Sequence, residues 1–368
     1  MSSASFSYID DERAFAAAVA RWRQIGAVAI DTEFIRTRTF FPIAALYQIA
    51  TTDEVALLDP VRLTQWEEFR ALLEDAAIVK VMHACSEDLE VFARHLDAKP
   101  AGLFDTQIAA GFLGTDFSPS YAALVRRYTG VEIGKHETRS DWLARPLREE
   151  QLHYAVADVE HLLTIHRAQT DELERLGRSQ WCDEEMRERI GFTLLDPELC
   201  YRNLARAWRC DGRQLARLKA LCAWRERYAR ERDLPRGRVV KDDALIELAC
   251  AGSVDLDVLT RVLDAATVRR HGRDLLASLG AADQLPPNEL PERLPAPLSG
   301  VETAAVRAMK TLGSERARAL EMAEELLSRR RDLEACVRSV REIGELPANF
   351  RGWRWPLVGE AYAAMLKP

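Results

Sequence analysis

The chain has no long apolar run. Nothing in its 368 residues approaches the ~18 apolar residues of a membrane span, and the first residues have neither a basic start nor an apolar stretch. The pattern therefore argues against a membrane protein and against a secretory signal peptide. We expect a cytoplasmic protein without a membrane partner.

Cysteine is present but follows no pattern. Seven cysteines are scattered singly, with no CxxC pair and no Cys/His cluster at zinc spacing. This distribution argues against a disulfide framework and against a structural zinc site. We expect buried, reduced thiols at Cys85, Cys182, Cys200, Cys210, Cys222, Cys250 and Cys336.

The chain also lacks a net positive charge. Its net charge is -7, whereas a protein that binds nucleic acid usually carries a positive charge. The distribution changes that conclusion. Residues 1–195 carry 21 basic and 32 acidic side chains (net -11), whereas residues 196–368 carry 30 and 26 (net +4). An acidic first half and a more basic second half suggest that acids hold metal while basic groups meet phosphate.

Residues 1–175 alternate strand-like and helix-like segments. The short polar turn at 51–54 suits antiparallel neighbours, and later strands separated by helices suit βαβ units. We therefore predict a mixed α/β sheet. Strands are expected at 27–34, 44–51, 54–59, 78–83 and 103–105, and helices at 65–75, 87–96, 106–113, 120–129 and 149–176.

From about residue 200 the strand signals stop. A proline-rich segment at 285–297 has the stiffness of a linker and separates two helical regions. The length of the chain favours two or three domains. Helices are expected at 212–233, 243–250, 255–264 and 269–278, and again within 301–366.

The segment Asp31-Thr32-Glu33-Phe34 ends the apolar run of the first expected strand. Residues two apart on a strand share a face, so Asp31 and Glu33 project together. Two interpretations remain open. Either the strand has reached the surface and Thr32 is the buried residue, or the two carboxylates are hard oxygen ligands for divalent cations.

Asp88 follows the strand expected at 78–83, in the first turn of the next helix. Acids at that position suit the helix macrodipole, with Ser86 as the N-cap, so a structural interpretation is strong. Spacing does not settle which of Glu87, Asp88 and Glu90 faces a site. A lone histidine such as His83 is more often structural than a ligand.

Tyr154 and Asp158 lie four residues apart in the helix expected at 149–176, so phenol and carboxylate share one face. The rest of that segment is apolar and small, as expected of a helix that packs on a sheet. A carboxylate on its buried side would need a partner. A Tyr–Asp pair at a surface edge is the equal alternative.

Together, Asp31-x-Glu33, Asp88 and Tyr154-x-x-x-Asp158 resemble the three-motif pattern of the DEDDy 3′–5′ exonucleases. Further segments resemble the ribonuclease D family and its HRDC domain. These are Leu46-Tyr47-Gln48-Ile49, the stretch 83–89, Phe104-Asp105-Thr106-Gln107, Ser140-Asp141-Trp142-Leu143, Arg145-Pro146-Leu147, the stretch 218–225 and Val240-Lys241-Asp242-Asp243. The resemblance implies a ribonuclease H-like exonuclease domain at 1–178, an HRDC domain at 205–285 and a second, diverged HRDC-like domain at 295–368.

The same resemblance implies a chemistry. Asp31, Glu33, Asp88 and Asp158 would coordinate two divalent ions, Mg²⁺ or Mn²⁺, and Tyr154 would orient the attacking water. The substrate would be the 3′ end of RNA, such as a tRNA precursor, trimmed to 5′-mononucleotides by a monomer. Contacts to the terminal nucleotides are expected from Thr32, Phe34, Gln48 and His83, although Phe34 is equally a core aromatic.

A basic helix is a further candidate, as a surface for the RNA backbone, although a solvated amphipathic face is the commoner case. Its residues are Trp224, Arg225, Arg227, Tyr228, Arg230 and Arg232. We expect Asp105, Asp116 and Asp141 to be structural. Two alternatives stay open: a DNA exonuclease, since proofreading domains carry the same acids, and a binding scaffold with an inactive nuclease fold.

Overall fold

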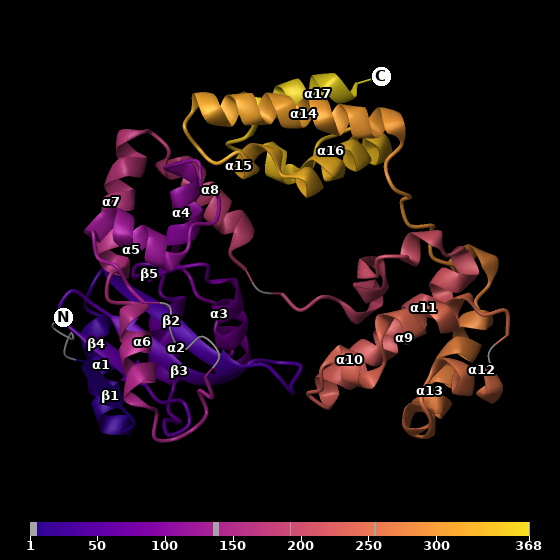
Figure 1. The fold of residues 1–368 in the computed structure, drawn as a ribbon, viewed down its shortest axis with the longest axis horizontal. Coiled ribbons are helices and arrows are strands. Elements are labelled where there is room, and N and C mark those ends of the chain that lie inside the picture. The colour runs from indigo at the N-terminus through magenta and orange to yellow at the C-terminus, as the bar shows by residue number, and fades with distance from the viewer. Residues whose placement is uncertain (1–5, 135–139, 192, 254, 368) are drawn as a thin grey trace. The chain divides into compact units, whose positions relative to one another are not determined.

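The computed structural model describes residues 6–134, 140–191, 193–253 and 255–367. Contacts between residues divide the chain into two units, which Figure 1 shows. Unit 1 comprises Met1–Ile35, Pro42–Phe192 and Leu298–Pro368, and unit 2 comprises Arg36–Phe41 and Thr193–Pro297. In the described ranges no helix has the length and apolar character needed to span a bilayer.

Unit 1 contains a six-stranded mixed sheet in the order β1-β4-β3-β2-β5-β6. Strands β2, β3 and β4 form an antiparallel meander, while β5 pairs in parallel with β2 and with β6. This confirms the predicted mixed sheet, and each expected strand agrees with the structure to within one residue at either end. The strands are β1 (Phe6–Ile9), β2 (Ala27–Ile35), β3 (Ile43–Ala50), β4 (Val55–Leu58), β5 (Val79–Met82) and β6 (Leu103–Asp105).

Helices cover both faces of the sheet. Because side chains alternate along a strand, β2 points Ile30 into the core with α1, α2 and α3, and Ala29 into the core with α6 and α7. The helices of this part are α1 (Glu12–Trp22), α2 (Glu67–Glu74), α3 (Ser86–Val91, extended by a π-helical turn at Phe92–Leu96), α4 (Thr106–Phe112), α5 (Tyr121–Thr129), α6 (Glu149–Ala157), α7 (Leu162–Arg175) and α8 (Ser179–Arg189).

The sequence analysis did not predict β1, α1 or α8. For α1 the signal was present, since Asp11 caps the helix and Phe15, Val19 and Trp22 recur at helical spacing on its buried side. For β1 only four residues carry the pattern, and it lies at the edge of the sheet on β4.

The single helix expected at 149–176 is wrong. The structure ends α6 at Ala157 and begins α7 at Leu162, with Asp158 as the C-terminal cap of α6. Between the two helices Val159 is fully buried in the core. The backbone N–H of His161 donates to the Tyr121 hydroxyl at 3.3 Å, which gives the broken helix a partner outside itself.

The C-terminal helices belong to unit 1 (Figure 1, yellow). Their apolar side chains, such as Met309 and Leu326, share one core with Ala109 and Phe112 of α4. The predicted helical region at 301–366 is thereby confirmed as helical. Its helices are α14 (Gly300–Ala319), α15 (Glu325–Ser328), α16 (Arg330–Ile343) and α17 (Glu360–Leu366), with short turns at Ala348–Phe350 and Trp355–Gly359.

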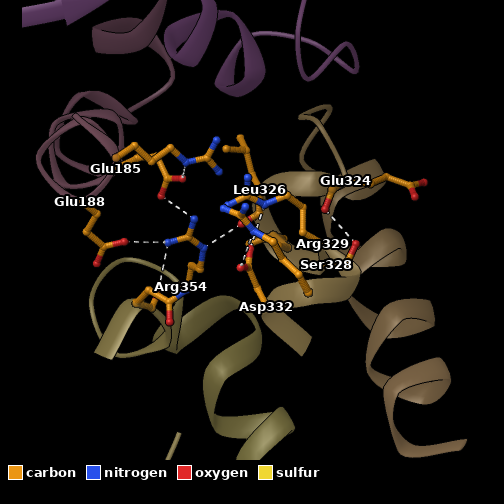
Figure 2. A network of polar contacts seen from close by, with 12 residues as sticks. Glu185, Glu188, Glu324, Leu326, Ser328, Arg329, Asp332 and Arg354 are labelled. Carbon is orange, nitrogen blue, oxygen red and sulfur yellow. Dashed lines mark hydrogen bonds and ion pairs between the residues drawn. The ribbon is translucent and has the colours of Figure 1, made fainter. Parts of the chain in front are cut away.

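Two buried arginines fasten this region. Arg178 donates to the carbonyl of Phe112 at 2.5 Å and also to the carbonyl of Leu320. Arg354 lies between Glu185 and Glu188 of α8 and the Leu326 carbonyl, as Figure 2 shows. Its side chain is only 4% exposed, and that of Glu185 only 1%. An isolated buried charge is costly, so this pair specifies how the helices pack.

Unit 2 is helical and is built around α9. Its core also includes Phe40 and Phe41, whose backbone N–H groups both donate to Asp233 Oδ1 at 3.0 Å. No sequence pattern marked residues 36–41 as part of this unit. The helices are α9 (Gly212–Glu231), α10 (Arg236–Val239), α11 (Asp242–Cys250), α12 (Leu256–Val262) and α13 (Ala265–Asp283), with 3₁₀ turns at Pro197–Asn203, Ala207–Arg209 and Pro287–Glu289.

Two arginines of the candidate RNA-binding face of α9 are engaged within the protein. The side chain of Arg225 is 5% exposed, donates to the Val240 carbonyl and pairs with Asp242 at 2.6 Å. Arg230 pairs with the buried Glu226. Helical periodicity did not reveal the burial of Arg225, because its partners Val240 and Asp242 come from a later segment, whereas Glu226, the partner of Arg230, lies on α9 itself.

The cysteines are all free, as expected. Burial was predicted for all seven, and this is wrong for Cys250, which is exposed at the end of α11.

Candidate active site

The site is built on the second half of β2. Strand β5 pairs with β2 only at Ala27–Ala29, so in the described residues the part of β2 that follows has no paired strand on that side. Asp31 and Glu33 stand on this open stretch and share one face. Their partners across β3 are Gln48 and Leu46, and a register shift follows at Glu33/Phe34. Ending β5 early leaves room beside the two acids.

Asp88 enters this room from α3. It is 7% exposed, and the Thr32 hydroxyl donates to its Oδ1 at 2.5 Å. The turn before α3 is held by Asp105, whose carboxylate accepts the backbone N–H groups of Ala84 and Cys85. Ala84 has a φ of +55°, an uncommon conformation for a residue with a side chain. Asp105 is structural, as predicted, and it fixes the position of Asp88.

The other two acids expected to be structural behave in the same way. Asp116 accepts the backbone N–H of Ser118, and Asp141 accepts that of Leu143. Both are exposed turn residues.

Asp158 arrives from the other helical layer, at the C-terminal end of α6. A carboxylate there meets the negative end of the helix dipole, which is unfavourable unless a positive charge compensates. The Tyr154 hydroxyl, one turn earlier, lies close enough to the Asp158 carboxylate for each group to shift the pKa of the other. The predicted pairing of phenol and carboxylate on one face is therefore present.

The four acids lie within electrostatic reach of one another. Burial raises the pKa of Asp31 well above its usual range, and the charges of Asp88, Asp158 and Glu33 raise it further. Burial, followed by the charges of Asp158 and Asp88, raises the pKa of Glu33 to about 9. Burial also raises the pKa of Asp88 to about 6 and that of Asp158 to about 7. Such carboxylates are stabilised by a cation placed among them.

Tyr154 stays protonated. Burial raises its pKa, and the charges of Asp158, Glu33 and Asp31 raise it further. The phenol is therefore a hydrogen-bond donor and acceptor at neutral pH, and it does not act as a free base.

The donor set suits hard divalent cations, which prefer carboxylate oxygens. Among the described residues, no three His, Cys, Asp or Glu side chains are already gathered as a ligand set. Four carboxylates from three segments supply the oxygen ligands that such a cation prefers, so the residues fit the metal by the chemistry of their donors.

The four expected substrate contacts are placed differently from one another. Thr32 is 6% exposed and holds Asp88, while Phe34 is partly buried and packs against the core. His83 is half-buried, with Nδ1 2.9 Å from the Thr106 hydroxyl and its ring beside Tyr121. Gln48 is fully buried opposite Asp31. Their contacts to substrate stay predictions, and only His83 and Phe34 retain exposed surface for one.

Sequence reasoning missed Tyr121 at the start of α5. Burial raises its pKa, and the charges of Asp158 and Asp31 contribute, so its hydroxyl lies near the acids. The only signal in the sequence was Ser120, which caps the helix and places Tyr121 in its first turn. Nothing in the spacing connected that turn to the acids.

Comparison with known proteins agrees with this geometry. The profile of a family described as 3′–5′ exonuclease matches residues 6–174, and that of the HRDC domain matches residues 214–279. Ribonuclease D of Pseudomonas paraeruginosa is 40% identical over 360 residues, which cover 96% of each chain. Ribonuclease D of Escherichia coli is 37% identical over 375 residues, which cover 99% of each.

A solved structure is similar over the same length. The crystal structure of Escherichia coli RNase D, described as an exoribonuclease involved in structured RNA processing, has a TM-score of 0.91 at 36% identity and covers 98% of both chains. The likeness thus includes the helical regions as well as the sheet.

Proposed function

The chain belongs to the ribonuclease D family, and from this premise we propose that it is a metal-dependent 3′–5′ exoribonuclease. It would hydrolyse RNA from the 3′ end and release 5′-mononucleotides. One observation carries the proposal beyond the family: at the open end of β2, the charges of Asp88 and Asp158, which come from two other segments, raise the pKa of Asp31 and of Glu33.

We assign these four carboxylates as ligands of two divalent cations, Mg²⁺ or Mn²⁺. When bound, the cations supply Lewis-acid stabilisation of the charge that develops on the scissile phosphate. The chain contributes the positions. Thr32 fixes Asp88 through its hydroxyl, and Asp105 fixes the turn that carries Asp88.

Tyr154 orients the attacking water. Its proton would be donated to the neighbouring Asp158 carboxylate, which would leave the lone pairs of the phenolic oxygen free to accept a hydrogen bond from water. A phenol that stays protonated can position water but cannot remove its proton. We therefore expect Tyr154→Phe to lower kcat through misplaced water, with the metal affinity retained.

The substrate we propose is RNA with a 3′ tail, such as a tRNA precursor. The chain would act in the cytoplasm as a monomer, with an exonuclease domain at 1–178, an HRDC domain at 205–285 and a second HRDC-like domain at 295–368. Thr32, Phe34, Gln48 and His83 are proposed to lie around the terminal nucleotides, with Thr32 and Gln48 acting from beneath the surface.

A labelling experiment tests the activity. The full chain is incubated with 5′-labelled RNA and Mg²⁺ or Mn²⁺, with and without a chelator, and with a DNA strand of the same sequence. We expect a one-nucleotide ladder that needs the metal and forms faster on RNA. Faster trimming of DNA would replace the RNA assignment by a DNA exonuclease.

A pair of variants tests the assigned acids. Asp31→Ala should abolish cleavage and leave RNA binding largely intact, while Asp53→Ala, an exposed acid in the turn between β3 and β4, should behave as wild type. Retained cleavage by the Asp31 variant would refute the metal assignment. Loss of cleavage in both variants would point to misfolding.

A further inference from the structure

A cavity of about 810 Å³ lies within unit 1, outside the acids assigned above. One wall is the turn that begins α3, at Cys85 and Ser86, two residues before Asp88. The opposite walls are the end of α8 and the start of α16. The cavity therefore begins beside the catalytic turn and extends toward the C-terminal helices.

Its basic lining comes from Arg189, Arg329, Arg331 and Arg354. Arg189 and Arg329 both lie over the ring of Phe117, at 5.0 and 5.5 Å from its centre. Figure 2 shows Arg329 and Arg354 among the polar contacts at this place. Contacts with an aromatic ring and with carboxylates fix guanidinium groups in position before any ligand arrives.

The acids that line the cavity are already engaged. Glu185 pairs with Arg189 and Arg354, and Asp332 pairs with Arg329 and Arg331. Glu188 pairs with Arg354. Asp105 is the remaining acid, and its carboxylate accepts four backbone N–H groups, those of Ala84, Cys85, Gln107 and Ile108. Each carboxylate thus has a partner within the protein, although the side chain of Glu188 is 38% exposed, and some arginine donors are left over.

Two arginines have hydrogen-bond donors that these carboxylates do not use fully. Within the described residues, Arg189 Nη2 is buried without a hydrogen-bond partner. Burial lowers the pKa of Arg189, and the charges of Arg329 and Arg354 lower it further against the pull of Glu185. Arg331 has a side chain that is 77% exposed and pairs with Asp332 only at 3.4 Å. An anion in the cavity would pair with the exposed guanidinium of Arg331 and would offset the repulsion that Arg329 and Arg354 exert on Arg189.

We propose that this cavity binds phosphodiester groups of the RNA strand upstream of its 3′ end. Guanidinium groups match phosphate oxygens with paired hydrogen bonds, and the volume lies within the range of small-ligand sites. Its wall at Cys85 and Ser86 belongs to the turn that carries Asp88, and from this we infer that a strand whose end is at the acids reaches the cavity. The inference rests on the proposed function and adds a strand subsite to it.

The same chemistry has a second source, the phosphate of a released mononucleotide, which the test separates. The chain offers a matched pair of variants. Arg331→Ala removes the exposed arginine of the cavity, while Arg330→Ala removes its neighbour on α16. Arg330 is 78% exposed, pairs with Glu334 at 2.8 Å and does not line the cavity.

For each full-length variant, we would measure binding of a single-stranded RNA of about 12 nucleotides in EDTA across a salt series. We expect Arg331→Ala to weaken binding by about threefold to tenfold and to lower the slope of log K against log salt by about 0.7, the value of one phosphate contact on a single strand. Arg330→Ala should leave both unchanged.

A second measurement is the ratio of kcat/KM for that RNA to kcat/KM for a dinucleotide. The ratio should fall several-fold in Arg331→Ala and should stay at the wild-type value in Arg330→Ala. Equal behaviour of the two variants would overturn the subsite. Weaker inhibition by 5′-AMP in Arg331→Ala, with unchanged RNA binding, would overturn it in favour of a product site.

Failure of this inference is distinct from failure of the proposed function. If wild type does not trim RNA with any metal, the function is wrong. If wild type trims RNA and the two variants are alike, only the subsite is wrong.

Discussion

The Asp158→Asn variant should lose activity and gain stability. The pKa of Asp158 is about 7 in the folded chain, against an ordinary value of 3.8, a difference of about 3 units. At 1.36 kcal/mol per unit, an ionised Asp158 destabilises the folded state by up to about 4 kcal/mol above pH 7. Because solvent still reaches part of the carboxylate, we expect about half of that, about 2 kcal/mol.

The sign follows from proton binding. A raised pKa means that the folded state binds the proton more tightly than the unfolded state, so stability falls as pH rises from 3.8 toward 7. The advantage of Asn is thus full at pH 8 and less than half as large at pH 5. In EDTA at pH 8 we expect a Tm increase of about 4 to 8 °C, measured by differential scanning calorimetry or fluorimetry.

Two controls sharpen this test. Asp116→Asn changes an exposed acid that caps its own turn, and its Tm should equal that of wild type within about 0.5 kcal/mol of stability. Adding Mn²⁺ should raise the Tm of wild type more than that of Asp158→Asn, because binding to the folded state adds stability. A variant that is less stable than wild type in EDTA, or a difference that does not depend on pH, would refute the reasoning.

Three further outcomes are expected. Arg354→Met breaks a buried ion pair, so it should lower the free energy of unfolding by about 3 kcal/mol, measured in urea by tryptophan fluorescence. Arg351→Ala removes an exposed pair and should lower it by less than about 1 kcal/mol. Equal losses would contradict the role of burial. Gln48→Met removes an amide whose polar atoms have no hydrogen-bond partner among the described residues. The Tm of this variant in EDTA should equal or exceed that of wild type. A fall of several degrees would show that the amide does have a hydrogen-bond partner. Removing residues 298–368 uncovers the apolar side of Phe112, so the shortened chain should bind a hydrophobic dye and melt less cooperatively; an unchanged melting curve would contradict the shared core.

Local patterns predicted most of the sheet. Apolar runs joined by a short polar turn identified the meander, and strands followed by helices identified the parallel part. The break between α6 and α7 was not predicted, because no Gly or Pro lies between residues 149 and 176 to mark it. Burial of Val159 and the hydrogen bond from His161 to Tyr121 decide it, and both depend on segments far away in sequence.

In the candidate site, too, local patterns predicted some features, while others depend on contacts between distant segments. Spacing placed Asp31 with Glu33 and Tyr154 with Asp158, but it left Asp88 as a helix-start acid. Only the resemblance to a family joined the three motifs. Neither the hydrogen bond from Thr32 to Asp88 nor the nearness of Tyr121 has a periodic signature, since each depends on how a helix docks on the sheet.

The arrangement of unit 1 has a consequence for synthesis. Its core on α4 and α8 is completed by residues that follow the whole of unit 2 in the chain. At 5 to 20 residues per second, the ribosome needs roughly 10 to 35 seconds to pass from residue 192 to residue 368. During that interval Phe112 and Met186 lack the C-terminal helices that cover them in the folded chain. We therefore expect the nascent chain to depend on a chaperone most at this stage of synthesis.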